Sequence, residues 1–590
     1  MRSRSVVTCV FTVLAGLAGC TRSAMPDLVT VAERSGFVRT GRFDEVQRLC
    51  ADFQTAWPDN IRCVELGRSP EGRPLLALVA SSDGALDPAT ARARNRPVVF
   101  MQGGIHAGEI DGKDAGVLAL RQMLQGTAAA GALERATLVF VPVFNVDGHE
   151  RFGRWNRPNQ IGPEEMGWRT TAQNLNLNRD YTKADAPEMQ AMLRVLTAWD
   201  PILLVDLHVT DGAEFEHDVS LNMAPTLAGD ADLIRAAVAF RDALMQKLGT
   251  QGSLPLDFYP SLLKDDDPTS GFAVSVAQTR FSQQYWSEHN RLGLLIETHS
   301  WKDYPTRVRV TRNAIVDVME LAAAHASEWR AGAIAADQRG AQVGGAPVAL
   351  AYGNTDHSTT IDFRGYAYTR EPSAISGGIR VRYDRTRPQI WKIPLRDGVT
   401  PTVTVTAPKA GYIVPSAHAA WVSDKLALHG IETRILAQPA TFEVEAFRVT
   451  KSTLATGTFE GHATRTLDGE WATEERLVPA GSLFVPIAQG KSHLLMTLLE
   501  PRSADSFVSW GFFNNAFERK EYMEAYVAEE VAAKMLKEDA SLKAAFEKRL
   551  ADDPMFAGSP TARLDFFYQR HPSWDERVNL YPIYRVARVP

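Results

Sequence analysis

Four short apolar runs in the first half of the chain constrain its fold more than any other feature. They lack the polar alternation of a half-exposed strand, which is typical of strands covered on both faces. Helical patterns lie between them, and the one over Ala186–Trp199 has Pro187 near its N-terminus. We therefore expect an α/β domain with a mixed, mostly parallel sheet flanked by helices. The four runs are Pro97–Met101, Ala136–Phe144, Pro201–Leu207 and Leu292–Glu297.

The pattern of the sequence changes near residue 335, from alternating strands and helices to mainly strands. Ala335–Pro347 reads as a linker, and alternating segments such as Thr360–Thr369 then predict strands. Segments rich in Lys and Glu between residues 518 and 553 predict a terminal pair of helices with solvated faces. We expect an export signal over 1–20, the α/β domain over 30–335, and a β-rich domain over 345–590 that ends in a helical segment.

The first twenty residues have the layout of a secretory signal. Arg2 and Arg4 precede an apolar stretch, Val6–Ala18, that is short for a membrane span. The segment Leu17–Cys20 resembles a bacterial lipobox, which implies cleavage before Cys20 and a lipid on its thiol. We expect an exported lipoprotein anchored to the outer membrane and facing the periplasm, or an extracellular protein. The alternative is an ordinary signal peptide with an incidental Cys.

The cysteines bear on the cellular compartment of the protein, and its net charge bears on the class of its binding partners. Outside the export segment only Cys50 and Cys63 remain, and they form either a disulfide or two buried thiols. The formal net charge is -6, and basic residues are interspersed with acidic ones. A nucleic-acid-binding protein usually carries a basic excess, so we expect no nucleic-acid partner.

Ionisable residues follow each of the four apolar runs. Since ligands bind beyond the carboxyl ends of strands in open α/β sheets, we expect these residues at one edge. Two His and one carboxylate with an open fourth position make a catalytic zinc site, and His106, Glu109 and His208 supply that set. The residues that follow the runs are His106 and Glu109, then Asp147 and His149, then His208, and finally Glu297.

Spacing alone does not identify the metal site. His325 and Glu328 repeat the separation of His106 and Glu109, but they lie in an Ala-rich helical pattern with no preceding strand. We expect that second pair to be ordinary neighbours on a helix surface.

With these motifs in place, residues 40–330 resemble the M14 family of zinc metallocarboxypeptidases. Five motifs stand in the family's order: GIHAGE (104–109), NVDGHERF (145–152), GWRTTAQNLNLNRDY (167–181), DLH (206–208) and LLIETHSW (294–301). The resemblance implies one Zn²⁺ per chain on His106, Glu109 and His208. It also implies Glu297 as the general base.

The same resemblance implies roles for three more residues. Arg169 would stabilise the oxyanion, and Asn178 with Arg179 would bind the terminal carboxylate of a peptide. The chain departs from the family pattern at Val146, which replaces Pro, and at Asn176, which replaces an Asp.

Two features of the substrate site stay open at this level. Tyr259 and Tyr285 both lie in the region of the family's substrate-capping Tyr. Phe272, Phe281 and the acidic run 265–267 leave an apolar pocket and a preference for basic residues both possible.

Three functions are compatible with the sequence. The first is a zinc carboxypeptidase acting on peptides with a free C-terminal carboxylate. The second is a zinc amidase of peptidoglycan stem peptides or of N-acyl amino acids, and the third is a non-catalytic binding lipoprotein. None of the implied ligands or the base is missing, which favours an enzyme.

Overall fold

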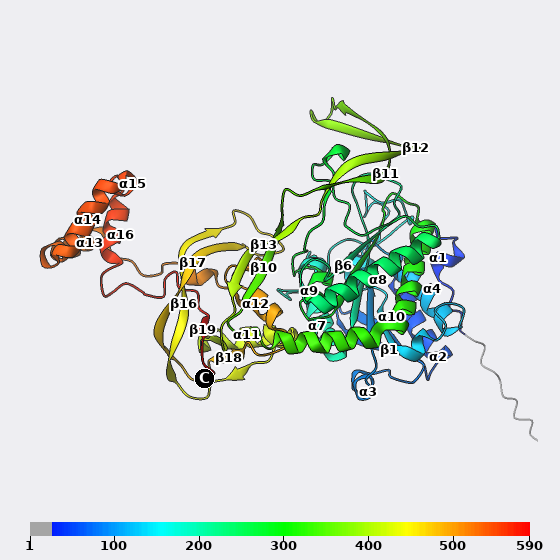
Figure 1. The fold of residues 1–590 in the computed structure, drawn as a ribbon, viewed down its shortest axis with the longest axis horizontal. Coiled ribbons are helices and arrows are strands. Elements are labelled where there is room, and N and C mark those ends of the chain that lie inside the picture. The colour runs from blue at the N-terminus through cyan, green and yellow to red at the C-terminus, as the bar shows by residue number, and fades with distance from the viewer. Residues whose placement is uncertain (1–25) are drawn as a thin grey trace, which may run out of the picture.

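The structure is a computed structural model, and it describes residues 26–590 (Figure 1). The predicted signal over 1–20, with Cys20, lies outside the described residues. The molecule is elongated: an α/β region occupies one end, a β-rich region lies beside it, and four short helices stand at the far end. Among residues 26–590, no helix combines the length and the apolar character needed to cross a bilayer.

An eight-stranded sheet organises the first half, with the strand order β1-β2-β4-β3-β5-β9-β6-β7. The central neighbours β4-β3-β5-β9 are parallel, and both flanks contain antiparallel pairs, so the predicted mixed sheet is confirmed. The four apolar runs became β3, β4, β5 and β9. The strands are β1 Ile61–Arg68, β2 Pro74–Ala80, β3 Val98–Gly103, β4 Thr137–Val141, β5 Leu203–Val209, β6 Val219–Ala224, β7 Pro255–Leu256 and β9 Leu292–Thr298.

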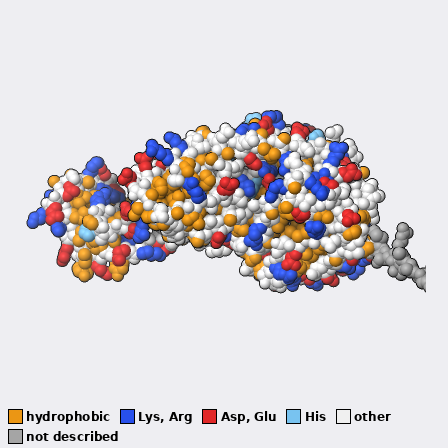
Figure 2. All heavy atoms as spheres, turned by 90° about the horizontal axis from the view of Figure 1, so that it is seen from below, with side chains coloured by type: hydrophobic (Ala, Val, Ile, Leu, Met, Phe, Trp, Pro, Cys, Tyr) orange, Lys and Arg blue, Asp and Glu red, His pale blue; other side chains and the backbone are white. Residues whose placement is uncertain are grey.

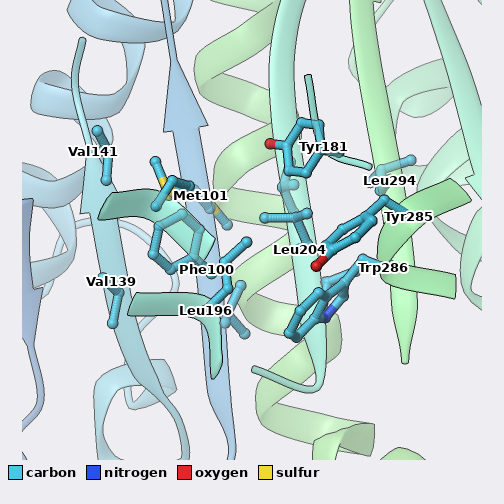
Figure 3. Close-up of a cluster of buried hydrophobic side chains, with 14 of the residues drawn as sticks. Phe100, Met101, Val139, Val141, Tyr181, Leu196, Leu204, Tyr285, Trp286 and Leu294 are labelled. Atoms are coloured by element: carbon cyan, nitrogen blue, oxygen red, sulfur yellow. The ribbon is translucent and has the colours of Figure 1, made fainter. Parts of the chain in front are cut away.

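Helices cover both faces of this sheet. The long α10 packs against α4 and α8, while α7 and α9 pack on the sheet from the other side, as right-handed crossovers require. Figure 3 shows the apolar layer between α7, α9 and the central strands, where Trp286 and Leu196 meet Phe100 and Leu204. The helices are α1 Val31–Arg34, α2 Phe43–Ala56, α3 Pro88–Ala93, α4 Asp111–Leu124, α5 Ala132–Arg135, α6 Val146–Glu150, α7 Pro187–Trp199, α8 Ala231–Thr250, α9 Ser282–Ser287 and α10 Tyr304–Gly340.

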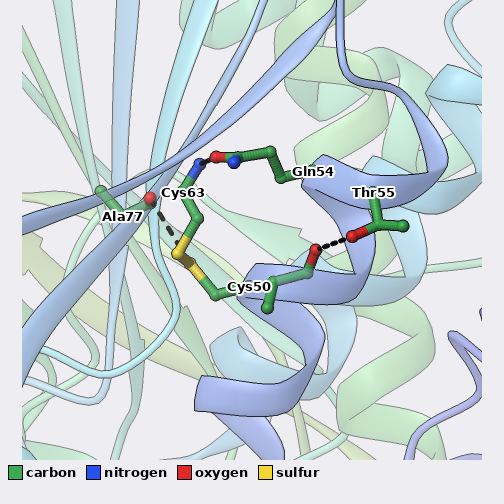
Figure 4. The surroundings of a disulfide bond; sticks show 6 residues. Cys50, Gln54, Thr55, Cys63 and Ala77 are labelled. Carbon is green, nitrogen blue, oxygen red and sulfur yellow. Dashed lines mark hydrogen bonds between the residues drawn. A yellow bond between two sulfur atoms is a disulfide. The ribbon is translucent and has the colours of Figure 1, made fainter.

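A disulfide joins Cys50 on α2 to Cys63 on β1 (Figure 4). The two alternatives left open by the sequence are thus resolved in favour of a crosslink. It closes a loop of sequence separation 13 and fixes α2 against the edge of the sheet. Such a bond persists in oxidising compartments.

The predicted linker begins too early. Helix α10 continues through Ala335 to Gly340, because this stretch consists largely of good helix formers and carries ion pairs. Asp337 pairs with Arg291, and Arg339 pairs with Asp230. Only residues 341–346 connect the helix to the next strand.

The second half contains three smaller sheets, of which one is shared with the α/β region. The hairpin β11–β12 projects from the molecule and pairs at its base with β8, a short strand of the first half (Figure 1). The strands are β8 Phe272–Ala273, β10 Pro347–Asn354, β11 Thr359–Pro372, β12 Ile379–Arg396, β13 Val399–Thr406, β14 Gly411–Val414, β15 Arg434–Ile435, β16 Ala440–Leu454, β17 Arg465–Val478, β18 Leu483–Pro486 and β19 Tyr584–Val586.

The second half also contains more helix than its sequence suggested. Helices α11 and α12 interrupt the strands, and the predicted terminal pair extends into four helices around a small core of their own. Figure 2 shows that this terminal group stands apart, and that acidic and basic side chains are mixed over the visible face. The helices are α11 Ser416–Leu428, α12 Ser492–Leu499, α13 Ala525–Glu538, α14 Ala540–Asp552, α15 Pro554–Ala557 and α16 Pro560–Tyr568.

Candidate metal centre and cleft

The segment between β3 and α4 carries two of the predicted metal ligands. Gly104 adopts a φ of 62°, a conformation that glycine tolerates, and this lets the chain turn sharply after β3. A Cβ at Gly108 would lie 2.6 Å from Cγ of Arg157 and 2.7 Å from the carbonyl oxygen of Gly167, so the packing here requires glycine. The turn closes with the N–H of Glu109 donating to the carbonyl of His106 at 2.8 Å.

The structure brings His106, Glu109 and His208 together. One ligand atom from each lies within 4.8 Å of the others, and all three residues are buried. The Glu109 carboxylate lies between the rings, 3.0 Å from Nδ1 of His106 and 2.9 Å from Nδ1 of His208. Two imidazole nitrogens and a carboxylate form a donor set that suits zinc, so these residues fit the implied ion.

The outer nitrogen of each ring lies close to an oxygen atom: that of His106 has a hydrogen-bond partner, and that of His208 has an ion-pair contact without hydrogen-bond geometry. Nε2 of His106 lies 3.0 Å from Oδ1 of Asn176, and Nε2 of His208 lies 3.0 Å from Oδ2 of Asp206. Partners of this kind orient metal-binding histidines and aim Nδ1 at the ion. The amide at Asn176 thus keeps the contact that the sequence put in doubt, and the carboxylate stands behind the other ring.

Burial and neighbouring charges set the protonation of the ligands. Burial lowers the pKa of His106 to about 4, although the charge of Glu109 opposes it. Burial alone would raise the pKa of Glu109, but His106 and Arg157 bring it well below its usual value. Burial would lower the pKa of His208, but the charges of Asp206 and Glu297 raise it well above its usual value. His106 and Glu109 therefore already have the protonation states that bind a metal, whereas His208 would lose a proton on binding.

Glu297 is next to this cluster because strands β5 and β9 are parallel neighbours. Its position pairs with His208 in the ladder, and both lie near the carboxyl ends of their strands. Burial raises the pKa of Glu297 to about 8; His208 opposes this, and the charge of Glu109 adds to it. A buried carboxyl with a raised pKa in a cleft is typical of an acid–base group.

Two arginines contact Oε1 of Glu109, the same oxygen that lies beside Nδ1 of His106. Nη2 of Arg157 lies 2.8 Å from Oε1, and Nη1 of Arg169 lies 3.4 Å from the same atom. Asn145, which follows β4, donates a hydrogen bond of 3.2 Å to the carbonyl of Arg169 and supports its loop. The sequence analysis did not find Arg157, because Arg151 and Arg154 stand in the same loop and nothing in the sequence distinguishes Arg157 from them.

Asn178 and Arg179 line the same cavity as Arg157. Arg179 stacks on the ring of Phe281 at 4.3 Å and donates to the carbonyl of Asn178 at 2.8 Å. Among residues 26–590 it forms no ion pair, whereas Arg157 and Arg169 share Glu109. A held guanidinium that faces a cavity without a carboxylate partner is suited to bind an anion.

A cavity of about 600 Å³ joins these groups. It is lined by the three candidate ligands, Arg169, Asn178, Arg179 and Glu297, and also by Tyr352 of the β-rich half. Tyr259 lies in this cavity with its hydroxyl 3.4 Å from Asp211. Tyr285 is only 1% exposed and bonds to His429, so of the two open candidates Tyr259 alone can reach a ligand.

Not every residue that follows a strand joins the site. Asp147 and His149 do not line the cavity: Asp147 pairs with Arg73, and His149 is buried beside Glu150. Strand β4 ends at Val141 and helix α6 begins at Val146, so both residues belong to the helix and not to the strand end. The other His-x-x-Glu pair, His325 and Glu328, lies on the exposed face of α10 as expected.

Comparison with known proteins identifies the first half. Residues 46–215 match the family model of zinc carboxypeptidases, Peptidase_M14. The chain carries an M14 zinc carboxypeptidase domain. The matched segment of the carboxypeptidase contains His106, Glu109 and His208 but ends before Glu297, so the place of Glu297 is given by the pairing of β5 with β9.

The chain is also similar to individual carboxypeptidases from other organisms. Carboxypeptidase 2 of Trichophyton rubrum is 24% identical over 477 residues, which is 75% of this chain and 79% of the relative. Carboxypeptidase B of Helicoverpa zea is 30% identical over 152 residues, 23% of this chain and 34% of the relative. A solved metallo-carboxypeptidase from Pseudomonas aeruginosa, in complex with (2-guanidinoethylmercapto)succinic acid, has a TM-score of 0.35 and 18% identity, covering 49% of this chain and 69% of that one.

Proposed function

We propose that this protein is an exported zinc-dependent carboxypeptidase that releases single amino acids from the C-terminus of peptides. The observation that carries the proposal is the shared cavity. It holds a buried His–Glu–His set, a neighbouring carboxyl with a raised pKa, and a free arginine.

His106, Glu109 and His208 would hold one Zn²⁺ per chain. When bound, the ion supplies Lewis acidity to the scissile carbonyl and lowers the pKa of water in the site. The positive charge also favours the ionised form of Glu297, which is the form that can accept a proton.

Glu297 accepts a proton from the attacking water and returns it to the departing amine, which is general base and then general acid work. Arg169 lies beside Glu109 with a partly exposed guanidinium, so it can donate hydrogen bonds to an oxyanion in the cavity.

Arg179 and Asn178 select the end of a chain. A guanidinium binds a carboxylate through two parallel hydrogen bonds, and a peptide has a free main-chain carboxylate only at its C-terminus. Tyr259, with more than a third of its surface exposed, can close over the bound residue.

We propose that one wall of the cavity receives the terminal side chain of the peptide. Met223, Ala224 and Leu227 line it, and the acidic run 265–267 does not. Asp257 lines it as well, but its carboxylate lies 3.4 Å from Arg241, which offsets its charge. We propose a preference for apolar terminal residues over basic ones.

Metal removal tests this function. Chelation should abolish cleavage of blocked dipeptides, and added zinc should restore it. His106→Ala should lose both zinc and activity, while the matched change His325→Ala should lose neither. Full activity in the chelated protein would refute the proposal.

A zinc amidase of peptidoglycan stem peptides or of N-acyl amino acids is the second candidate, because Arg179 would bind any free carboxylate. Purified stem peptides assayed beside linear peptides separate the two. A non-catalytic binding lipoprotein would bind such peptides without cleaving either set.

The disulfide between Cys50 and Cys63 supports an exported location. We propose that Cys20 carries a lipid that anchors the protein to the outer membrane, facing the periplasm. Labelled fatty acid should enter the wild-type protein but not Cys20→Ser, and cell fractionation should place the two differently.

A further inference from the structure

The tip of the hairpin between β16 and β17 reaches the carboxypeptidase site. Oε2 of Glu460 accepts a hydrogen bond of 3.0 Å from the backbone N–H of Asn176. These two residues are 284 positions apart in the sequence, so the contact joins the β-rich half to the site.

Asn176 contacts both His106 of the metal set and Asn178 of the carboxylate-binding pair. Its side-chain oxygen lies 3.0 Å from Nε2 of His106 and accepts from the N–H of Asn178 at 3.1 Å. Asn176 therefore contacts a metal ligand on one side and the carboxylate-binding pair on the other.

A second set of contacts fixes the segment that follows Arg179. Nζ of buried Lys183 lies 2.5 Å from Asp180 and 3.1 Å from Asp185. Asp185 in turn contacts Nε2 of His462 at 2.6 Å and Nζ of Lys425 at 3.2 Å. His462 and Lys425 both belong to the β-rich half, so Asp185 links it to the segment after Arg179.

The hairpin tip is shaped to present Glu460. Phe459 and His462 form a bridge in both directions, and Glu460 and Gly461 between them have φ values of 48° and 82°. A non-glycine residue in the left-handed region costs free energy, and such positions persist where surrounding contacts hold them.

We propose that Glu460 is a positioning residue of the carboxypeptidase, acting through Asn176 on His106 and on the pair Asn178–Arg179. The proposal rests on the proposed zinc-dependent function. Without the Glu460 acceptor, Asn176 loses the contact that holds its backbone, so His106 and Asn178 both lose a fixed partner.

Two measurements on the full-length protein test this role. Zinc release to a chromogenic chelator reports on His106, and KM for a blocked dipeptide reports on the carboxylate-binding pair. Partners behind metal ligands typically change metal affinity by about 10- to 100-fold, and Glu460 acts through one more residue. We expect Glu460→Ala to release zinc roughly 5-fold faster and to raise KM by a similar factor.

The variants separate positioning from general destabilisation. Glu460→Gln keeps an oxygen acceptor of the same length and should match the wild type in both measurements. Glu460→Asp keeps the charge but is too short, so it should behave as Glu460→Ala does, and it carries the test should the Ala variant not fold. Glu475→Ala, on the exposed face of β17, is the matched control and should change neither value.

The outcomes are distinct. Wild-type zinc release and KM in Glu460→Ala would overturn the positioning role, as would equal changes in Glu475→Ala. A wild-type protein that retains no zinc would instead refute the proposed function.

Discussion

His208 and Glu297 occupy paired positions on the parallel neighbours β5 and β9. The ladder therefore fixes the distance between a candidate metal ligand and the candidate base, without help from a mobile loop. Rigid strands hold such groups more precisely than loops do. The arrangement makes the contribution of Glu297 separable from metal binding.

Glu297→Gln should abolish peptide cleavage while zinc content stays at the wild-type level. An amide of the same shape cannot accept the proton, and loss of a general base costs about 10²- to 10⁴-fold in kcat. Steady-state kinetics with metal analysis checks this. Unchanged kcat would rule out Glu297 as the base.

Arg179→Ala should lower kcat/KM for peptides with a free carboxylate by roughly 100-fold, since hydrogen bonds between charged groups contribute about 1.5–3 kcal/mol. Arg179→Lys should have a kcat/KM between those of the wild type and Arg179→Ala, because an ammonium group keeps the charge but lacks the paired donors. Peptides with an amidated C-terminus serve as the control. An equal loss for both peptide types would contradict a role in carboxylate binding.

Tyr259→Phe should change KM, whereas Tyr285→Phe should change the stability of the fold. The first removes a hydroxyl from the cavity and should raise KM by roughly 3- to 10-fold with little change in thermal stability, since a hydrogen bond is worth about 1 kcal/mol. The second breaks the buried bond to His429 and should destabilise the fold by about 1–3 kcal/mol without changing KM. Melting curves and kinetics on both variants decide the assignment, and a reversed pattern would make Tyr285 the capping residue.

Removing the disulfide with Cys50→Ala and Cys63→Ala should lower the free energy of unfolding by about 3 kcal/mol, the value for a closed loop near this length. The double variant avoids an unpaired thiol. Denaturant unfolding with and without reductant measures the effect, and only the wild type should respond to the reductant.

Glu188→Gln should stabilise the protein at pH 8 but not at pH 4. Burial raises the pKa of Glu188 to about 7, and the charges of Asp147 and Asp180 add to the shift. Below its unfolded pKa the carboxyl is neutral in both states. As pH rises from that value to about 7, ionisation of the unfolded state alone progressively costs stability, up to roughly 3 kcal/mol, and above the folded pKa the loss is complete. Thermal melts at both pH values test this, with exposed Glu134→Gln as a control that should respond at neither.

The sequence predicted the parts of the fold that follow from local patterns. Continuous apolar runs predicted β3, β4, β5 and β9, and the residues after three of these strands meet in one cavity. It could not show that Asp147 and His149 lie outside the cavity, because that depends on how soon α6 begins after β4. The early linker prediction failed for a similar reason, since ion pairs to distant residues extend α10 to Gly340.

Long-range contacts were beyond the reach of the sequence. Arg157 joins the site through the folding of its loop onto Gly108, and a lone Arg carries no sign of that. Tyr259 and Tyr285 became distinguishable only once burial was known. The sequence around Glu460 carries no signal of a role in the site, and its partner Asn176 is 284 positions away.

The contacts from the β-rich half bear on the order in which the protein is made. The backbone N–H of Asn176 donates a hydrogen bond to Glu460. Arg280, which borders the pocket segment, donates one of 2.7 Å to Asp505. A ribosome completes residues 30–335 long before it reaches either acidic partner. During synthesis the chain would thus pass through a stage in which every candidate metal ligand exists but Asn176 and Arg280 lack these acidic partners, so the cleft takes its final form only when the second half has folded against it.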